Sequence, residues 1–244
     1  MSEKHSAKSG KFRLFRKYLL IALLIFLIFP VLHVASTRFW NPSWSPMQTE
    51  RSLETHFSGS KSHSVRLQWT PLEKIPVELI HDIWASEDQA FFSHHGFDMW
   101  QLKRAMDAAR EGRHSVRGAS TITMQCARSV YLWQGRSYVR KALEAYYTVW
   151  MELLLSKPRI LELYLNHIEL GPGIYGVGAA AREYYNKTPE ELSKSEMLSL
   201  AAILPNPLKW SPVHPNAIVQ RKIARVQRLA GNAPFPVHEL GLKK

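Results

Sequence analysis

Two adjacent carboxylates mark the stretch SEDQAFFSHHGFD, residues 86–98, as a place where chemistry could occur. Glu87 and Asp88 are followed closely by Phe91 and His94, so that an acidic pair lies among aromatic rings. Apolar surroundings disfavour the ionised form of a carboxylate and make it a stronger base. Glu87 is therefore a candidate for general acid–base chemistry, in which a positioned side chain takes or gives a proton.

Hydroxyl side chains at a predicted helix start indicate a second site, for an anion. In GASTITMQCARS, residues 118–129, a Gly-Ala turn precedes Ser120 and Thr121. The free backbone amides of a helix start bind anions. Ser and Thr are also common helix caps, and an ordinary N-cap would need no ligand. Both interpretations stay open for this segment on its own.

A group of cations follows this helix start: Arg128, Arg136, Arg140 and Lys141. Arg140 and Lys141 precede Glu144 by four and three residues, so that the three side chains can share one helix face. A solvated face with salt bridges would have the same pattern. The gathering of cations beside a candidate anion site favours a clamp for a diphosphate instead.

The composition of the chain narrows the class of partner. The 244 residues include 32 Lys and Arg against 20 Asp and Glu, which gives a formal net charge of +12. This balance favours anionic partners, among them nucleic acid, anionic lipid and phosphorylated substrates. Cys126 is the single cysteine, so no disulfide can form within the chain, and we interpret it as a small core residue.

The N-terminal region has the pattern of a membrane anchor. Residues 1–17 are strongly basic, and residues 18–35, YLLIALLIFLIFPVLHVA, contain no charged side chain. About 17–25 apolar residues span a bilayer as a helix, and a basic flank predicts a cytoplasmic N-terminus. The alternative is a cleaved signal peptide, but the apolar region of a signal peptide is only about 7–15 residues long. The sequence HVAST after this segment is also a poor match to a signal-peptide cleavage site. We therefore expect an uncleaved anchor.

The rest of the chain divides into a linker and a mostly α domain. Residues 36–64 are polar and lack a helical period, so we expect an irregular juxtamembrane linker there. Residues 65–244 form the expected main domain, with a short strand within SVRLQWTPL, residues 64–72. Apolar periodicity and cap residues from Pro76 onward predict successive helices. These are 76–86, 98–111, 120–132, 138–155, 158–168, 174–185, 193–203 and 215–230.

Two further patterns do not predict a cofactor or metal site. GPGIYG, residues 171–176, matches the glycine spacing of dinucleotide-binding loops, but the segment before it has a helical period rather than that of a strand. The eleven His residues show no metal-ligand spacing. We therefore expect no metal ligands from the protein itself.

Five ordered blocks of this sequence resemble the family 51 glycosyltransferases, the peptidoglycan polymerases, and within them the monofunctional, membrane-anchored members. The resemblance runs from about residue 69 to about residue 215. Its blocks are EDQAFFSHHG, GASTITMQCARS, RKALE, KPRILELYLN and GIYGVGAAAREYYNK followed by LAAILPNPLKWSP. The second block departs from the family pattern, because Met124 replaces the first Gln of a pair, Arg128 replaces Lys and Ser129 replaces Asn.

The resemblance implies a mostly α, lysozyme-like fold and the polymerisation of lipid II. In that reaction the GlcNAc 4-hydroxyl of lipid II attacks the MurNAc anomeric carbon of a glycan chain linked to undecaprenyl diphosphate. The anomeric carbon inverts and the lipid diphosphate leaves. The implied location is the bacterial inner membrane, single-pass, with the catalytic domain in the periplasm. The implied partners are lipid II, the lipid-linked glycan chain and the membrane, with other cell-wall synthesis and division proteins as further candidates and no nucleic acid.

The resemblance also implies a role for each candidate residue. Glu87 would be the general base, and Glu144 would orient the cations or assist the leaving group. Asp88, Phe91 and His94 would shape the pocket of the base. A divalent cation, Mg²⁺ or Mn²⁺, could bridge the substrate diphosphate, although no dedicated ligand cluster is visible in the sequence. The implied substrate-binding residues are Asp88, Phe91, His94, Ser120, Thr121, Gln125, Arg128, Arg136, Arg140 and Lys141.

Two alternatives remain open at this point. A lysozyme-like hydrolase would also use a catalytic Glu, but it would have no need of a diphosphate clamp. A membrane scaffold without activity would use the basic face to hold anionic lipid, and the altered second block would then mark lost catalysis.

Overall fold

The computed structural model of the chain describes residues 3–57, 65–112, 120–135 and 137–242. Its contacts divide the chain into two compact units, Met1–Trp40 and Asn41–Lys244. The first unit contains the helix α1, Glu3–Ser36. Within α1, the segment Phe12–Ser36 is long and apolar enough to cross a membrane, by its length and composition. The expected anchor, residues 18–35, lies inside this segment.

The second unit is mostly α, as the sequence predicts. Within the described residues it contains nine α-helices, and each of the eight helices expected from Pro76 onward is present with ends shifted by a few residues. The described residues also include the 3₁₀ turns Leu72–Lys74 before α3, Pro189–Glu191 between α8 and α9, and Val237–Leu240 after α10. The α-helices are α2 Pro46–Phe57, α3 Val77–Glu87, α4 Met99–Arg110, α5 Ile122–Tyr131, α6 Tyr138–Leu154, α7 Lys157–His167, α8 Gly176–Tyr185, α9 Lys194–Ile203 and α10 Ala217–Asn232.

Side-chain caps explain why several of these helices begin where they do. Ser193 and Glu196 form a capping box at the start of α9. Five other helices each begin after a single N-cap residue, whose side chain accepts a hydrogen bond from a backbone amide of the first turn. Each cap satisfies an amide that has no partner within the helix. These caps are Asp98, Thr121, Ser137, Ser156 and Asn216.

The expectation of an irregular segment over residues 36–64 was wrong for α2. Polar contacts to distant segments hold this helix. Arg51 Nε donates to Glu169 Oε1 at 3.3 Å, and the backbone amide of Gln134 donates to Glu50 Oε2 at 2.6 Å. Met47 and Gln48 at its start are buried. The helix therefore belongs to the compact unit that begins at Asn41.

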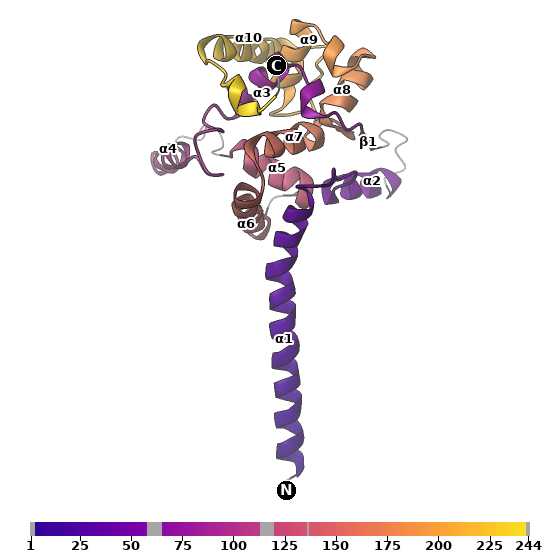
Figure 1. Ribbon diagram of the computed structural model, residues 1–244, viewed down its shortest axis with the longest axis vertical. Helices are drawn as coiled ribbons and strands as arrows, with labels where there is room; N and C mark the ends of the chain where they lie inside the picture. Colours follow the sequence, from indigo (N-terminus) through magenta and orange to yellow (C-terminus); the bar gives the residue numbers. More distant parts are fainter. Residues whose placement is uncertain (1–2, 58–64, 113–119, 136, 243–244) are drawn as a thin grey trace. The chain divides into compact units, whose positions relative to one another are not determined.

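The helices of the second unit form two packed groups (Figure 1). In one group, α3, α9 and α10 pack against one another, and in the other α5 packs against both α6 and α7. Burial raises the pKa of the Cys126 thiol, which lies fully buried in α5 and stays protonated. This agrees with its interpretation as a core residue. The largest fully buried side chains include Leu79, Ile80, Ile83, Phe91, Ile122, Met151, Ile160, Leu161, Tyr164 and Tyr175.

A small sheet closes the side of the unit at α8. Its strand order is β1–β3–β2, with β1 Arg66–Leu67 parallel to β3 Ile174–Tyr175, and β2 Glu169–Gly171 antiparallel to β3. The expected strand within residues 64–72 is therefore present. The hairpin of β2 and β3 follows α7 directly, so Gly171 and Gly173 belong to a hairpin rather than to a βαβ unit, and Gly176 begins α8.

The end of α7 holds the segment that leads into α3. The side chain of Asn166 accepts a hydrogen bond from the Thr70 amide at 2.7 Å and donates one to the Thr70 carbonyl at 2.9 Å. One turn earlier, Glu162 Oε1 accepts a bond from the Leu72 amide at 3.1 Å. Asn166 is fully buried. Part of the family-like block KPRILELYLN therefore serves to position α3 and the carboxylate at its end.

We expect Asn166→Ala to lower the free energy of unfolding by about 2–4 kcal/mol, because it leaves a buried amide and a buried carbonyl of Thr70 without their partner. Chemical denaturation of the full chain in detergent measures the change. Asn232→Ala, at an exposed position in α10, is the matched control and should be nearly neutral. Equal stability of the two variants would contradict a clamping role for Asn166.

Candidate active site

Asp88 is the structural member of the acidic pair. It follows the last residue of α3 and is 1% exposed. Its Oδ2 accepts hydrogen bonds from His94 Nε2 at 2.9 Å and from the backbone amide of Ile122 at 3.0 Å. Ile122 is the first residue of α5, so a carboxylate satisfies a free amide at the positive end of that helix. Asp88 therefore ties the end of α3 to the start of α5.

His94 is held in one orientation by bonds to both of its ring nitrogens. The Gly96 amide donates to Nδ1 at 3.1 Å, which leaves Nε2 to carry the hydrogen that Asp88 accepts. Gly96 has a φ of +87°, and a Cβ there would lie 2.7 Å from Thr148 Cγ2, so glycine fits this position. The Gly96 carbonyl accepts a bond from Thr121 Oγ1 at 2.7 Å. These contacts fix the loop that follows the acidic pair.

Lys157 fastens the same loop from the start of α7. Its Nζ donates to the His94 carbonyl at 2.7 Å and to Glu152 Oε1 at 2.9 Å. The ammonium also lies 4.5 Å from the ring centroid of Phe91, which is fully buried. Phe91 and His94 thus shape the surroundings of the acidic pair from inside the protein.

Glu87, in contrast, reaches the edge of a cavity. Gln125 Nε2 of α5 donates to Glu87 Oε2 at 3.0 Å, and the Tyr164 hydroxyl of α7 donates to Gln125 Oε1 at 3.1 Å. Burial raises the pKa of Tyr164, and the negative charge of Glu87 raises it further, so Tyr164 remains a hydroxyl donor. This relay orients the Gln125 amide and, through it, one carboxylate oxygen of Glu87.

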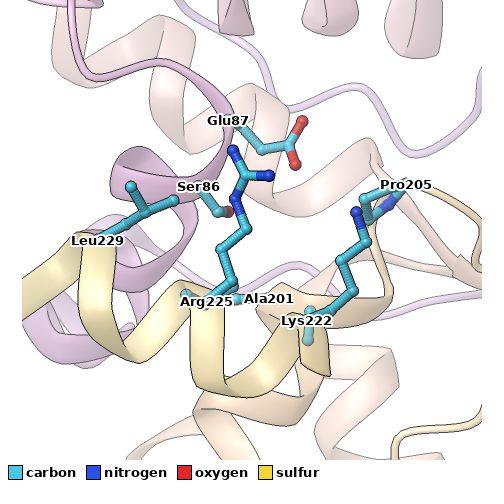
Figure 2. A pocket seen from close by; sticks show the side chains of 9 residues that line it. Ser86, Glu87, Ala201, Pro205, Lys222, Arg225 and Leu229 are labelled. Atoms are coloured by element: carbon cyan, nitrogen blue, oxygen red, sulfur yellow. The ribbon is translucent and has the colours of Figure 1, made fainter. Parts of the chain in front are cut away.

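The cavity at Glu87 lies between the ends of α3 and α9 and one face of α10 (Figure 2). Small and apolar side chains form much of its wall, and Lys222 and Arg225 of α10 supply positive charge. Sequence reasoning missed these two cations, because the family-like blocks end before α10. Their spacing of three residues places them on one helix face. The lining residues are Ser86, Glu87, Ala201, Ala202, Pro205, Lys222, Arg225, Val226 and Leu229.

The second candidate carboxylate, Glu144, is held by two cations of its own helix. Arg140 Nη1 donates to Glu144 Oε2 at 2.8 Å, and Lys141 Nζ donates to Glu144 Oε1 at 2.5 Å. Glu144 is 2% exposed and Arg140 8% exposed, whereas the side chain of Lys141 is 46% exposed. Lys141 also donates to Ser120 Oγ at 3.3 Å. The expected cluster is present, and it presents a net positive charge beside the start of α5.

At the helix start itself, the hydroxyl of Thr121 is committed within the protein. It accepts a bond from the Met124 amide and donates to the Gly96 carbonyl. With Asp88 on the Ile122 amide, two of the free amides at the start of α5 already have partners. The ordinary N-cap therefore describes Thr121, and Ser120 faces Lys141. The Gly-Ala turn expected before them, residues 118–119, lies outside the described residues.

Of the two remaining predicted cations, the structure describes Arg128 but not Arg136. Arg128 is exposed on α5, three residues after Gln125 and so on a neighbouring part of the same helix face. Its positive charge acts on the Tyr164 hydroxyl of α7, which places it near the Glu87 relay. Arg136 lies outside the described residues.

Hydrogen bonds engage several carboxylate oxygens of this site. Both oxygens of Glu144 accept bonds from cations, and Asp88 Oδ2 already serves His94 and Ile122. Within the part of the chain that the structure describes, no group of three or more His, Cys, Asp or Glu side chains could hold a metal ion.

The site thus combines a carboxylate at a cavity edge with a separate cationic cluster that suits an anionic group. The transglycosylase family model matches residues 54–230, and the chain belongs to this family. The mostly α, lysozyme-like fold class expected from the sequence agrees with that membership and with the helices described above.

Curated relatives match almost the whole chain. A biosynthetic peptidoglycan transglycosylase of Xanthomonas axonopodis pv. citri is 44% identical over 236 residues, covering 96% of this chain and 95% of the relative. A protein of the same name from Caulobacter vibrioides is 39% identical and covers 91% of this chain and 94% of its own length. The one from Xylella fastidiosa is 40% identical over 90% of this chain and 92% of its own length.

We expect Glu144→Gln to destabilise the protein by about 3–5 kcal/mol, because it leaves the buried guanidinium of Arg140 without a compensating charge. Denaturant unfolding of the full chain measures this. Glu190→Gln, at an exposed position, is the control and should be silent. A Glu144→Gln variant of unchanged stability would show that the cluster does not depend on this charge for its structure.

Proposed function

We propose that this transglycosylase is a peptidoglycan glycosyltransferase that polymerises lipid II. The donor is the glycan chain on undecaprenyl diphosphate, and the acceptor is lipid II. The observation that carries the proposal is the contrast between the two carboxylates. Glu87 is oriented by a neutral amide at a cavity edge, while Glu144 is buried under two cations. Such a division suits a base at one place and an anion clamp at another. The names of the relatives support the substrate class.

In the proposed reaction, Glu87 takes the proton of the GlcNAc 4-hydroxyl of lipid II. As that O–H bond breaks, the oxygen forms a bond to the MurNAc anomeric carbon, and the bond from this carbon to the diphosphate oxygen breaks. Attack on the face opposite the leaving group inverts the anomeric carbon. The Tyr164–Gln125 relay keeps the Glu87 carboxylate in place for the transfer.

The cationic cluster would receive the departing diphosphate. Arg140 and Lys141 carry two positive charges against the single charge of Glu144, and Lys141 and Arg128 are both exposed enough to meet a ligand. Cations fixed before the reaction stabilise a developing negative charge at little cost in reorganisation. Glu144 would orient these cations. If Mg²⁺ or Mn²⁺ takes part, it would neutralise charge on the substrate diphosphate.

The apolar segment of α1 supports a single-pass inner-membrane protein. The basic N-terminal residues would stay in the cytoplasm and the catalytic unit would lie in the periplasm. An anchor of this kind confines the enzyme and its lipid-linked substrates to one surface. Other cell-wall synthesis and division proteins are further proposed partners.

Incubation of the full chain with purified lipid II in detergent tests the proposal directly. A polymer that a muramidase degrades is the expected product. Release of soluble fragments from purified cell-wall sacculi, without polymer, would indicate a hydrolase instead. Binding of lipid II without any product would indicate a scaffold.

We expect Glu87→Gln to reduce polymerisation by at least about 100-fold while the fold persists, because the amide cannot accept the acceptor proton. Turnover of lipid II and thermal unfolding are measured together. Glu78→Gln, an exposed position on the same helix, is the matched control. Near-normal turnover by a folded Glu87→Gln protein would remove Glu87 from the role of base.

Arg128 stands where the family pattern has Lys, and we expect Arg128→Lys to be tolerated because the site needs mainly positive charge there. Arg128→Ala should lower kcat/KM on lipid II by roughly 100-fold, the scale of losing one charge-stabilising group. Arg228→Ala, at an exposed position on α10, is the control. Wild-type activity in Arg128→Ala would show that this part of α5 does not face the substrate.

A further inference from the structure

We propose that Arg225 is a positioning residue for the general base: it pairs with the Glu87 carboxylate, holding it ionised and aimed into the cavity. The proposal rests on the proposed function, in which Glu87 accepts a proton. It concerns a residue of α10, beyond the part of the chain in which the family-like blocks lie.

The geometry that points to this pairing is seen at the cavity between α3, α9 and α10. Figure 2 shows the side chain of Arg225 extending from α10 with its guanidinium directed at the Glu87 carboxylate. Both residues are half-buried, so the charges are only partly screened by water. Glu87 and Arg225 lie far apart in the chain, and the packing of α3 against α10 places both of them at this cavity.

A charged partner performs a task that the Gln125 relay cannot perform. The Gln125 amide orients one oxygen of Glu87, at 3.0 Å, but as a neutral group it adds little to the stability of the ionised form. A base must be ionised before it can take a proton. A guanidinium stays protonated at any working pH, and its planar fork matches the geometry of a carboxylate. Arg225 therefore suits this task better than a lysine would.

The other charged groups around Glu87 define what Arg225 must offset. Asp88, next in the chain, is a carboxylate that disfavours a second negative charge nearby. From α7, Tyr164 stays neutral, and Arg128 of α5 acts on Tyr164. From α10, Lys222 lines the same cavity. No charge comes from Ala201 and Ala202 of α9 or from Pro205 after it, which also line the cavity.

The test is the pH dependence of polymerisation by the full chain. With Arg225→Gln, the ionised form of Glu87 loses a stabilising charge, so protonation extends to higher pH. We expect the acidic limb of the kcat/KM profile to move up by about one pH unit, the lower end of the effect of one adjacent opposite charge. On that limb the variant should be about tenfold slower, and well above it activity should recover. Arg225→Lys keeps the positive charge, so its acidic limb should lie close to that of the wild type.

Arg228→Gln is the matched control, because it removes the same charge from an exposed position of the same helix. It should leave the profile where the wild type has it. An Arg225→Gln profile that coincides with this control would overturn the proposal. A raised KM with an unmoved acidic limb would also overturn it, since Arg225 would then be binding substrate rather than setting the state of the base.

A second measurement separates this proposal from the proposed function. Carboxyl carbons of glutamate, labelled with ¹³C, can be titrated by NMR in the full chain, with Glu87→Gln used to assign the signal. We expect the Glu87 signal to titrate at higher pH in Arg225→Gln than in the wild type. If the wild type makes no polymer but this shift occurs, the pairing stands and the assigned reaction fails. If the signal titrates identically in both proteins, the pairing fails whatever the activity.

Discussion

The hydrogen bond from the Ile122 amide to the buried carboxylate of Asp88, at 3.0 Å, is the contact on which the site depends. It joins the end of α3 to the beginning of α5, where the carboxylate also meets the positive end of a helix. Glu87 precedes Asp88 in the chain, and α5 carries the Gln125 that orients it. Ser120, just before α5, meets the Lys141 of the cationic cluster. One contact thus sets the start of α5 relative to both candidate carboxylates.

The two candidate carboxylates illustrate how position in one fold can separate two chemical tasks. Glu144 pairs with Arg140 and Lys141, and in the proposed function it orients these cations. Glu87 receives a neutral amide on one oxygen and faces a cavity. The sequence predicts apolar surroundings for Glu87 from the nearby Phe residues. The buried ring of Phe91 packs against Lys157, and the cavity at Glu87 combines small and apolar side chains with the cations Lys222 and Arg225.

Contacts that are local in the chain could be predicted from the sequence, and those that join distant segments could not. The spacing of Arg140, Lys141 and Glu144 predicts their cluster, because residues three and four apart meet on a helix. Helix periods and caps likewise predict α3 to α10. Nothing local in α2 shows that Arg51 will reach Glu169, which is why that helix was missed. The same holds for α10, whose cations reach the Glu87 cavity only through its packing against α3.

The three departures from the family pattern in α5 differ in consequence because their side chains differ in exposure. Met124 and Ser129 are 7% and 3% exposed, so they act through the packing of α5 rather than through contact with a ligand. Gln125, the retained member of the Gln pair, is the residue that donates to Glu87. Arg128 alone of the three is exposed, and it keeps the positive charge of the residue it replaces. The altered segment therefore preserves both the amide and the charge on which the proposed chemistry depends, and this argues for a working enzyme over a scaffold.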